Sequence, residues 1–195
     1  MADRYDSFAK LAAATRAGVD YRIRCVDRGT SVVVLAPHGG TIEPETAQIA
    51  EAIAGELFSF YAFEALKPGV HGDFHITSHR FDEPQAIDLV RRSHRAVAVH
   101  GRKDDGHDTV WLGGLATGMR DAIGQALRDA GFAADLNTAL PGVHKTNICN
   151  RTSSGAGVQL ELPRSLRRTL ADNADIMNRF CCAVRDGICG AGSLA

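Results

Sequence analysis

The chain has 195 residues, of which 45% are hydrophobic and 23% charged, and its 22 Lys and Arg nearly balance 23 Asp and Glu. A formal charge of −1 excludes the basic excess that binding to nucleic acid or to an anionic membrane surface requires. This length suits one domain with a single core. We therefore expect one domain over residues 1–195 and no nucleic-acid or membrane partner, and no pattern specifies an oligomeric state.

The cysteines and the N-terminal segment indicate the compartment. The five cysteines form no CxxC pair and no spacing typical of a disulfide framework, which favours a reducing environment. Residues 1–18 carry charges on both sides of a short apolar stripe rather than the apolar core of a signal peptide, and no stretch reaches the length of a membrane span. We expect synthesis in the cytoplasm, with cell lysis as a route of release.

In the first half of the chain, hydrophobic periodicity alternates between that of helices and that of strands. The predicted elements are a helix over 6–14, strands over 20–26 and 31–37, a helix that begins at Pro44, and strands over 60–66 and 74–78. Because turn-forming residues at 27–29 separate the first two strands, we expect those strands to form an antiparallel hairpin.

The second half repeats the alternation. The predicted elements are a helix over 83–94, a strand over 95–101, a helix that ends at Gly131, a strand over 132–137, an irregular segment over 138–150, a strand over 157–163 and a long helix over 164–188. Strands that alternate with helices in this way predict a three-layer α/β domain with a mostly parallel mixed sheet and helices on both faces.

Two apolar strands end in a histidine followed by glycine, at His38 and at His100. Ligands of open α/β sheets bind beyond the carboxyl ends of the strands, so both imidazoles can point into one crevice. Glu43 precedes Pro44, where a helix N-terminus favours negative charge. Two histidines and one carboxylate form the three-ligand set of catalytic zinc hydrolases. Glu45 is the alternative ligand, and we rank it second because it belongs to the first helical turn.

Alternation along the last predicted strand indicates a candidate base. Val158, Leu160 and Leu162 share one face, and Gln159 and Glu161 share the other. A carboxylate beside a metal-activated water can accept its proton, which makes Glu161 the candidate. The alternative is a solvent-facing glutamate on an edge strand.

A polar, glycine-rich segment over 147–157 precedes this strand and contains Asn150 beside Arg151. A planar guanidinium flanked by amides suits a substrate carboxylate, because it can donate two parallel hydrogen bonds. The alternative is an ordinary surface arginine.

The motifs APHGGTIEPET, FHITSHRFDEP, AVHG, NICNR and GVQLELP together resemble the poly-γ-glutamate hydrolase family, which includes a bacteriophage enzyme and prophage relatives. The resemblance runs from about residue 31 to 168. It implies a compact zinc-carboxypeptidase-like fold and endo-type cleavage of γ-glutamyl amide bonds in a bacterial capsule polymer. Residue by residue, it implies zinc ligands at His38, Glu43 and His100, a general base at Glu161, and carboxylate binding by Asn150 with Arg151.

Several further residues are singled out. Arg80 is a candidate carboxylate or oxyanion partner, the alternative being that Asp82 caps a helix there. The chemistry assigns no role to His75 or His79. The segment after His100, RKDDGHDTVWLGG, is more acidic than a polyanion substrate would favour. His107 and Asp108 are predicted to lie in a solvated loop, the alternative being a second ion site. Cys149 is predicted to be a small buried residue, the alternative being a cysteine nucleophile.

The sequence thus predicts a zinc-dependent hydrolase of γ-glutamyl amides, with a polyanionic peptide or a small carboxylate-bearing amide as substrate. Two alternatives remain open: a zinc amidase for a small acylated amino acid, and an inactive metal-binding prophage protein that acts through a partner. Glu161 argues for the enzyme, because an inactive binder has no use for a base.

Overall fold

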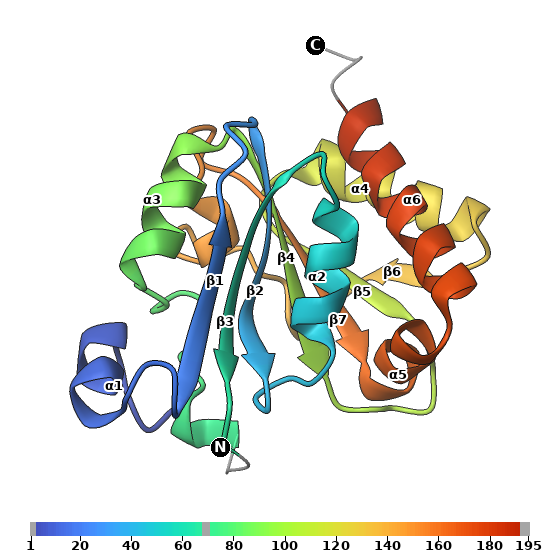
Figure 1. Cartoon of the computed structure of the whole chain (residues 1–195). Helices are drawn as coiled ribbons and strands as arrows, with labels where there is room; N and C mark the ends of the chain where they lie inside the picture. The colour runs from blue at the N-terminus through green and yellow to red at the C-terminus, as the bar shows by residue number, and fades with distance from the viewer. Residues whose placement is uncertain (1–2, 68–70, 192–195) are drawn as a thin grey trace.

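The computed structural model describes residues 3–67 and 71–191 (Figure 1). The helices are α1 (Phe8–Ala14), α2 (Thr46–Ala54), α3 (Pro84–Arg92), α4 (Thr117–Asp129), α5 (Arg164–Asp172) and α6 (Ala174–Gly190), with short 3-10 helices η1 (His71–Asp73) and η2 (Ile148–Asn150). The strands are β1 (Tyr21–Val26), β2 (Val32–Gly40), β3 (Ser59–Ala65), β4 (Arg95–Arg102), β5 (Val110–Gly113), β6 (Ala134–Leu136) and β7 (Val158–Pro163).

The strands form one mixed sheet in the order β1-β3-β2-β4-β7-β5-β6. β1 pairs with β3, and β5 with β7, in antiparallel fashion, and the other neighbouring pairs are parallel. In Figure 1 the arrows of β2, β3, β4 and β7 point the same way, and that of β1 points the opposite way. The predicted mostly parallel mixed sheet is confirmed.

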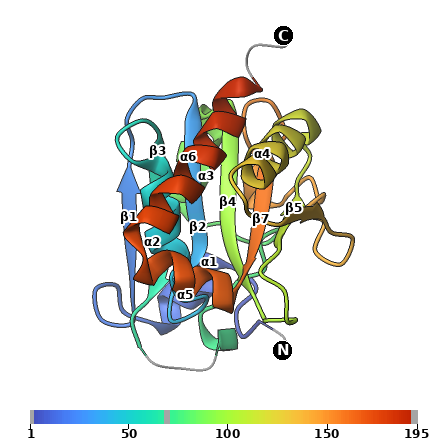
Figure 2. The same ribbon diagram turned by 90° about the vertical axis from the view of Figure 1, so that its right-hand side faces the viewer.

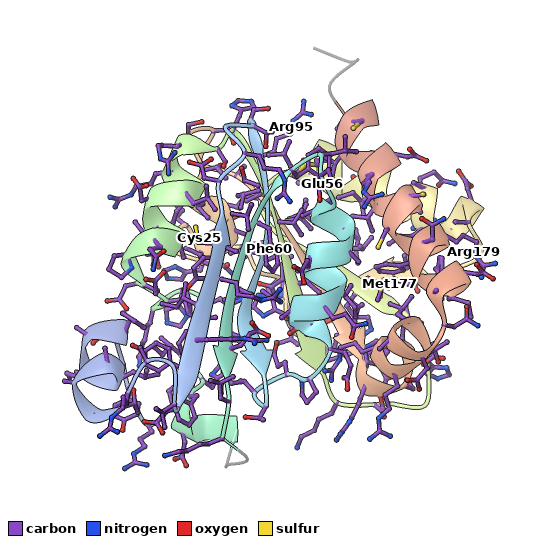
Figure 3. The ribbon with its side chains drawn as sticks, viewed as in Figure 1. Cys25, Glu56, Phe60, Arg95, Met177 and Arg179 are labelled. Atoms are coloured by element: carbon purple, nitrogen blue, oxygen red, sulfur yellow. The ribbon has the colours of Figure 1, made fainter. Side chains whose placement is uncertain are left out.

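Helices cover both faces of the sheet. Val32 and Val34 of β2 pack in the cluster that includes α2, α4, α5 and α6, whereas Val33 and Leu35 pack with α1 and α3. Figure 2 shows α4, α5 and α6 in front of the sheet. In Figure 3, Met177 lies on the side of α6 toward α2, where it is buried, and the exposed Arg179 points outward. The predicted three-layer arrangement is therefore confirmed.

The predicted hairpin of the first two strands is wrong. β1 pairs with β3 rather than with β2. The crossover through α2 places β3 directly beside β2, and β4 takes the other edge of β2, so β1 cannot pair with β2 and pairs with the outer edge of β3. The continuous apolar run of β2 agrees with this central position, and the incomplete burial of β1, in which only Tyr21 is buried, agrees with an edge position.

Three other expectations differ from the structure. Residues 74–78 form loop and turn rather than a strand, and the four-residue β5 lies in the acidic segment, where we predicted no strand. The predicted long closing helix is two helices, because Asn173 adopts an extended backbone and its side chain accepts a hydrogen bond from the backbone N–H of Ile176. Within the described residues, no helix combines the length and apolar character needed to cross a bilayer.

Candidate metal and catalytic site

Three neighbouring strands, β2, β4 and β7, carry the candidate side chains at their carboxyl ends, which point downward in Figure 1. His100 of β4 lies directly opposite Glu161 of β7 in the register. β2 becomes irregular between Ala36 and Gly39, next to His38. The chain then turns, and the backbone N–H of Glu43 donates to the carbonyl of His38 at 2.9 Å. This tight loop returns Glu43 to the strand end.

His38, Glu43 and His100 meet as a compact cluster, and all three are buried. Nδ1 of His38 lies 3.1 Å from Oε1 of Glu43 and 3.2 Å from Nδ1 of His100. Nδ1 of His100 lies 3.6 Å from Oε2 of Glu43. Ligand atoms at 2.0–2.1 Å from a tetrahedral zinc ion are about 3.3–3.4 Å apart. The observed separations bracket that spacing.

The protonation pattern makes this cluster electron-rich. The carbonyl oxygen of Ile76 lies 2.8 Å from Nε2 of His38, so Nε2 of a neutral His38 is the protonated nitrogen and Nδ1 presents its lone pair to Glu43. Burial opposes ionisation of Glu43, but the attraction and hydrogen bonds that the imidazoles of His38 and His100 offer when they carry a proton hold its pKa well below the ordinary value. Acceptor atoms thus converge on one point, and this donor set fits a divalent cation.

The neighbours of His100 lead to the same conclusion. Burial acts to lower the pKa of His100, yet the carboxylates of Glu43 and Glu161 raise it above its ordinary value. A group that is buried and still favours a positive charge lies in a site that attracts cations. The backbone N–H of Gly101 donates to Oε2 of Glu43 at 2.8 Å, which fixes the orientation of this carboxylate.

Glu161 lies beside the cluster and is buried, with 7% of its surface exposed. Nε2 of Gln159 donates to Oε1 of Glu161 at 2.7 Å, and Nδ2 of Asn147 donates to Oε1 of Gln159 at 2.9 Å. Burial, together with the charge of Glu43, raises the pKa of Glu161 to about 7. Such a carboxyl can accept a proton and return it near neutral pH.

A cavity of about 740 Å³ opens over the cluster, which is a size typical of ligand sites. His38, Glu43, His100 and Glu161 line it from the strand ends, and residues 139–144 also line it. The cavity therefore brings the predicted metal ligands and the predicted base to one surface.

A family model described as poly-γ-glutamate hydrolase matches residues 5–182. The chain belongs to this family. The SPβ prophage-derived UPF0714 protein YoqZ of Bacillus subtilis (strain 168) is 35% identical over 189 residues, which cover 95% of this chain and 66% of YoqZ. The chain thus spans just under two thirds of that relative.

Two solved structures of similar proteins share the whole fold. A bacteriophage poly-γ-glutamate hydrolase is 31% identical, with a TM-score of 0.90 over 99% of this chain and 100% of its own. The zinc-free apo form of YndL is 27% identical, with a TM-score of 0.90 over 97% of this chain and 98% of its own. The predicted family and fold class are confirmed.

The other residues predicted for this poly-γ-glutamate hydrolase family member lie outside the lining of the cavity. The amide of Asn150 is fully used: Oδ1 accepts from the backbone N–H groups of Leu115 and Gly157, and Nδ2 donates to the carbonyls of Gly142 and His144. Asn150 therefore connects, through hydrogen bonds, the segments around Leu115, Gly142 and Gly157.

Arg151 and Arg80 are placed differently from a carboxylate clamp. Nε of Arg151 donates to the carbonyl of Thr146 at 2.7 Å, and Nη2 donates to the carbonyl of His79 at 3.0 Å. Arg80 is exposed in the turn after Thr77, to whose carbonyl its backbone N–H donates. Carboxylate binding by these side chains remains a prediction, and the hydrogen bonds of Arg151 indicate a role in holding the loop.

The other candidates are also located. The carboxylate of Glu45, the alternative ligand, lies 3.4 Å from Nη1 of Arg167 rather than between the histidines. His107 and Asp108 are exposed, and Cys149 is buried with its pKa raised to about 12 by that burial. A thiol of such a pKa is a poor nucleophile near neutral pH.

His75, to which the sequence assigned no role, belongs to the site. One of its ring nitrogens lies within 4.8 Å of ligand atoms of His38 and Glu43, and its ring centroid is 4.1 Å from that of His38. Burial and the proximity of His38 lower the pKa of His75 to about 4, so it is neutral. Nδ1 of His75 faces Oδ1 of Asp3 at 2.6 Å, so His100 remains the predicted third ligand.

Asp3 and Gln159 are further site residues that sequence reasoning missed. Oδ2 of Asp3 accepts from the backbone N–H and the hydroxyl of Thr77 at 2.8 and 2.6 Å, which anchors the loop that carries His75. No pattern near Asp3 indicates this contact, since the two segments are far apart in sequence. For Gln159 a signal existed, because it shares the face of Glu161 along the alternating strand.

Proposed function

We propose that this chain is a zinc-dependent hydrolase that cleaves γ-glutamyl amide bonds of poly-γ-glutamate. One observation carries the proposal: the convergence of the acceptor atoms of His38, Glu43 and His100 beside a buried glutamate, Glu161, whose pKa is raised to about 7. Membership of the poly-γ-glutamate hydrolase family supports the choice of bond and polymer.

The metal would be held by Nδ1 of His38, Nδ1 of His100 and the carboxylate of Glu43. When bound, a zinc ion polarises an amide carbonyl and lowers the pKa of a water molecule toward about 7. Histidine and carboxylate ligands suit several first-row metals, and the near-tetrahedral spacing of the ligand atoms favours zinc. The zinc-free description of the YndL structure supports the same metal.

Glu161 would accept the proton of the attacking water and return it to the leaving nitrogen. Its raised pKa suits both steps, because a carboxyl titrating near neutral pH loses and gains a proton with little driving force against either. Gln159 holds the carboxylate through the 2.7 Å hydrogen bond to Oε1.

The proposal is tested by measuring zinc content and turnover of the same purified protein. We expect stoichiometric zinc and a fall in the molar mass of poly-γ-glutamate, with little release of the acyl group from a small N-acylglutamate. Turnover of the small substrate alone would support the zinc amidase. Stoichiometric zinc with no amide cleavage would support the inactive metal-binding protein.

A further inference from the structure

A second cavity adjoins the candidate site. Its volume is about 550 Å³, and it shares with the first cavity a wall formed by Glu43, His75, Thr77, Gly101, Arg102 and Lys103. Beyond this wall it extends toward Pro44, Asp104 and the beginning of α5. The two cavities thus meet at Glu43 of the metal cluster, and a chain long enough to extend past the cluster would occupy both.

Four cationic side chains line the second cavity, and two of them already donate hydrogen bonds to backbone carbonyls of the protein. Arg167 donates from Nε to the carbonyl of Leu162 and from Nη1 to that of Pro44. Arg102 is buried, donates to the carbonyls of Lys103, His107 and Thr109, and lies over the ring of Trp111. Both arginines therefore shape the wall.

Lys103 and Arg164 are the other two cations of this cavity. Both are exposed, and neither side chain has a hydrogen bond or ion pair within residues 3–67 and 71–191. Lys103 lies on the wall shared with the first cavity, and Arg164 lines the second cavity alone. Their ammonium and guanidinium groups can therefore bind an anion without breaking an existing contact.

The acidic residues near these cations are already occupied. Asp104 accepts from the backbone N–H and the hydroxyl of Ser165, and Asp108 also accepts from that hydroxyl. Asp105 pairs with Arg102 at 3.0 Å. The acidity of this segment argued against a polyanionic substrate. Its carboxylates, however, already bind Ser165 at the start of α5 and Arg102.

We propose that the second cavity is a carboxylate-binding subsite, in which Lys103 and Arg164 bind the free α-carboxylates of γ-linked glutamyl residues next to the scissile bond. This inference rests on the proposed function. A γ-linked polymer carries one free carboxylate per residue along an otherwise uncharged chain, so successive residues can each meet a cation. A small acylated amino acid is short and would leave the second cavity unused.

The test uses the double variant Lys103→Gln, Arg164→Gln and a control double variant, Arg91→Gln, Arg168→Gln. The control removes the same charge from exposed arginines that line neither cavity. On poly-γ-glutamate we expect KM to rise about tenfold in the test variant, as two partly exposed ion pairs would give, with kcat within about twofold. The control should match wild type, and the salt dependence of KM should weaken only in the test variant.

Binding of poly-γ-glutamate is measured separately by calorimetry, with every protein zinc-loaded and carrying Glu161→Gln to prevent turnover. An equal KM and an equal affinity in the test and control variants would overturn the subsite, as would the absence of polymer binding by the parent Glu161→Gln protein. If wild type does not cleave the polymer, while the parent Glu161→Gln protein binds it and the test variant in that background loses the binding, the subsite stands and the proposed reaction fails. The two proposals are therefore distinguishable.

Discussion

Nε2 of His38 donates to the carbonyl oxygen of Ile76 at 2.8 Å, and this contact selects the nitrogen that faces the metal cluster. A carbonyl only accepts, so Nε2 carries a proton, and the neutral form of His38 then has its lone pair on Nδ1. Partners of this kind fix the tautomer and the ring orientation of metal-binding histidines. The loop that replaces the predicted strand over 74–78 therefore has a direct effect on the site.

The ligand assignment predicts the effect of removing each side chain. His38→Ala, Glu43→Ala and His100→Ala should each weaken zinc binding by more than about 100-fold, since even the loss of an outer partner typically costs 10- to 100-fold. Glu45→Ala is the matched control and should retain zinc, because its carboxylate pairs with Arg167. Zinc content after dialysis, measured by atomic absorption, checks all four variants.

His75→Ala separates the two histidines that could complete the cluster. We expect this variant to retain zinc, because Nδ1 of His100 lies 3.2 Å from Nδ1 of His38, whereas Nδ1 of His75 faces Asp3. Loss of zinc in His75→Ala, together with its retention in His100→Ala, would transfer the third ligand position to His75. The same zinc assay, with circular dichroism to verify folding, decides between them.

The sequence predicts much of the site because regular strands position it. His38, His100 and Glu161 all lie near strand ends, so a rule about the carboxyl edge of the sheet is enough to group them. Asp3 and His75 come from segments without regular periodicity, and their contact depends on how two distant loops pack. No local pattern encodes such a contact.

In the fold, too, the locally encoded features were predicted and those that depend on long-range packing were not. Local signals identified the strands and the alternation of layers, but the order of the strands depends on competition for edges. The turn at 27–29 favours a hairpin locally, and the crossover through α2 fills that edge of β2 with β3 instead. The four-residue β5 is at the lower limit of the length over which a strand pattern can be recognised.

Gly40→Ala tests the turn between His38 and Glu43. Gly40 has a φ of +65°, and a Cβ there would lie 2.1 Å from the carbonyl oxygen of Ala65. We expect the free energy of unfolding to fall by about 3 kcal/mol, with weaker zinc binding, because backbone must move beside the ligands. Gly18→Ala is the control: its φ is +78° but nothing lies within 4 Å, so about 1 kcal/mol is expected. Equal losses in urea unfolding would contradict the steric argument.

Gln159→Leu tests how the base is tuned. The hydrogen bond from Gln159 stabilises the ionised form of Glu161 and so acts to lower its pKa. Its loss should raise that pKa, and because the base acts when deprotonated, the rise of kcat/KM with pH should move to higher pH. Gln125→Leu, on the exposed side of α4, should leave the profile unchanged. If the pH at which kcat/KM rises is unchanged in Gln159→Leu, a group other than Glu161 determines that rise.

Arg151→Lys distinguishes loop support from direct carboxylate binding. The guanidinium donates to the carbonyls of Thr146 and His79, and lysine cannot make both bonds from one planar group. We expect a loss of about 1–2 kcal/mol in the free energy of unfolding and equal kinetic effects on substrates with and without a side carboxylate. A selective rise in KM for carboxylate-bearing substrates would instead support the carboxylate contact predicted from the sequence.

Glu161→Gln separates catalysis from metal binding. Glutamine keeps the shape of the side chain but cannot accept the proton of water, and Glu161 is not among the proposed ligands. We therefore expect a folded, zinc-loaded variant whose kcat on γ-glutamyl amides falls at least about 100-fold, since general acid–base groups contribute about 10² to 10⁴ in rate. The upper part of that range is expected because the same carboxyl would also serve the leaving nitrogen. A variant as fast as wild type would show that Glu161 is not the base.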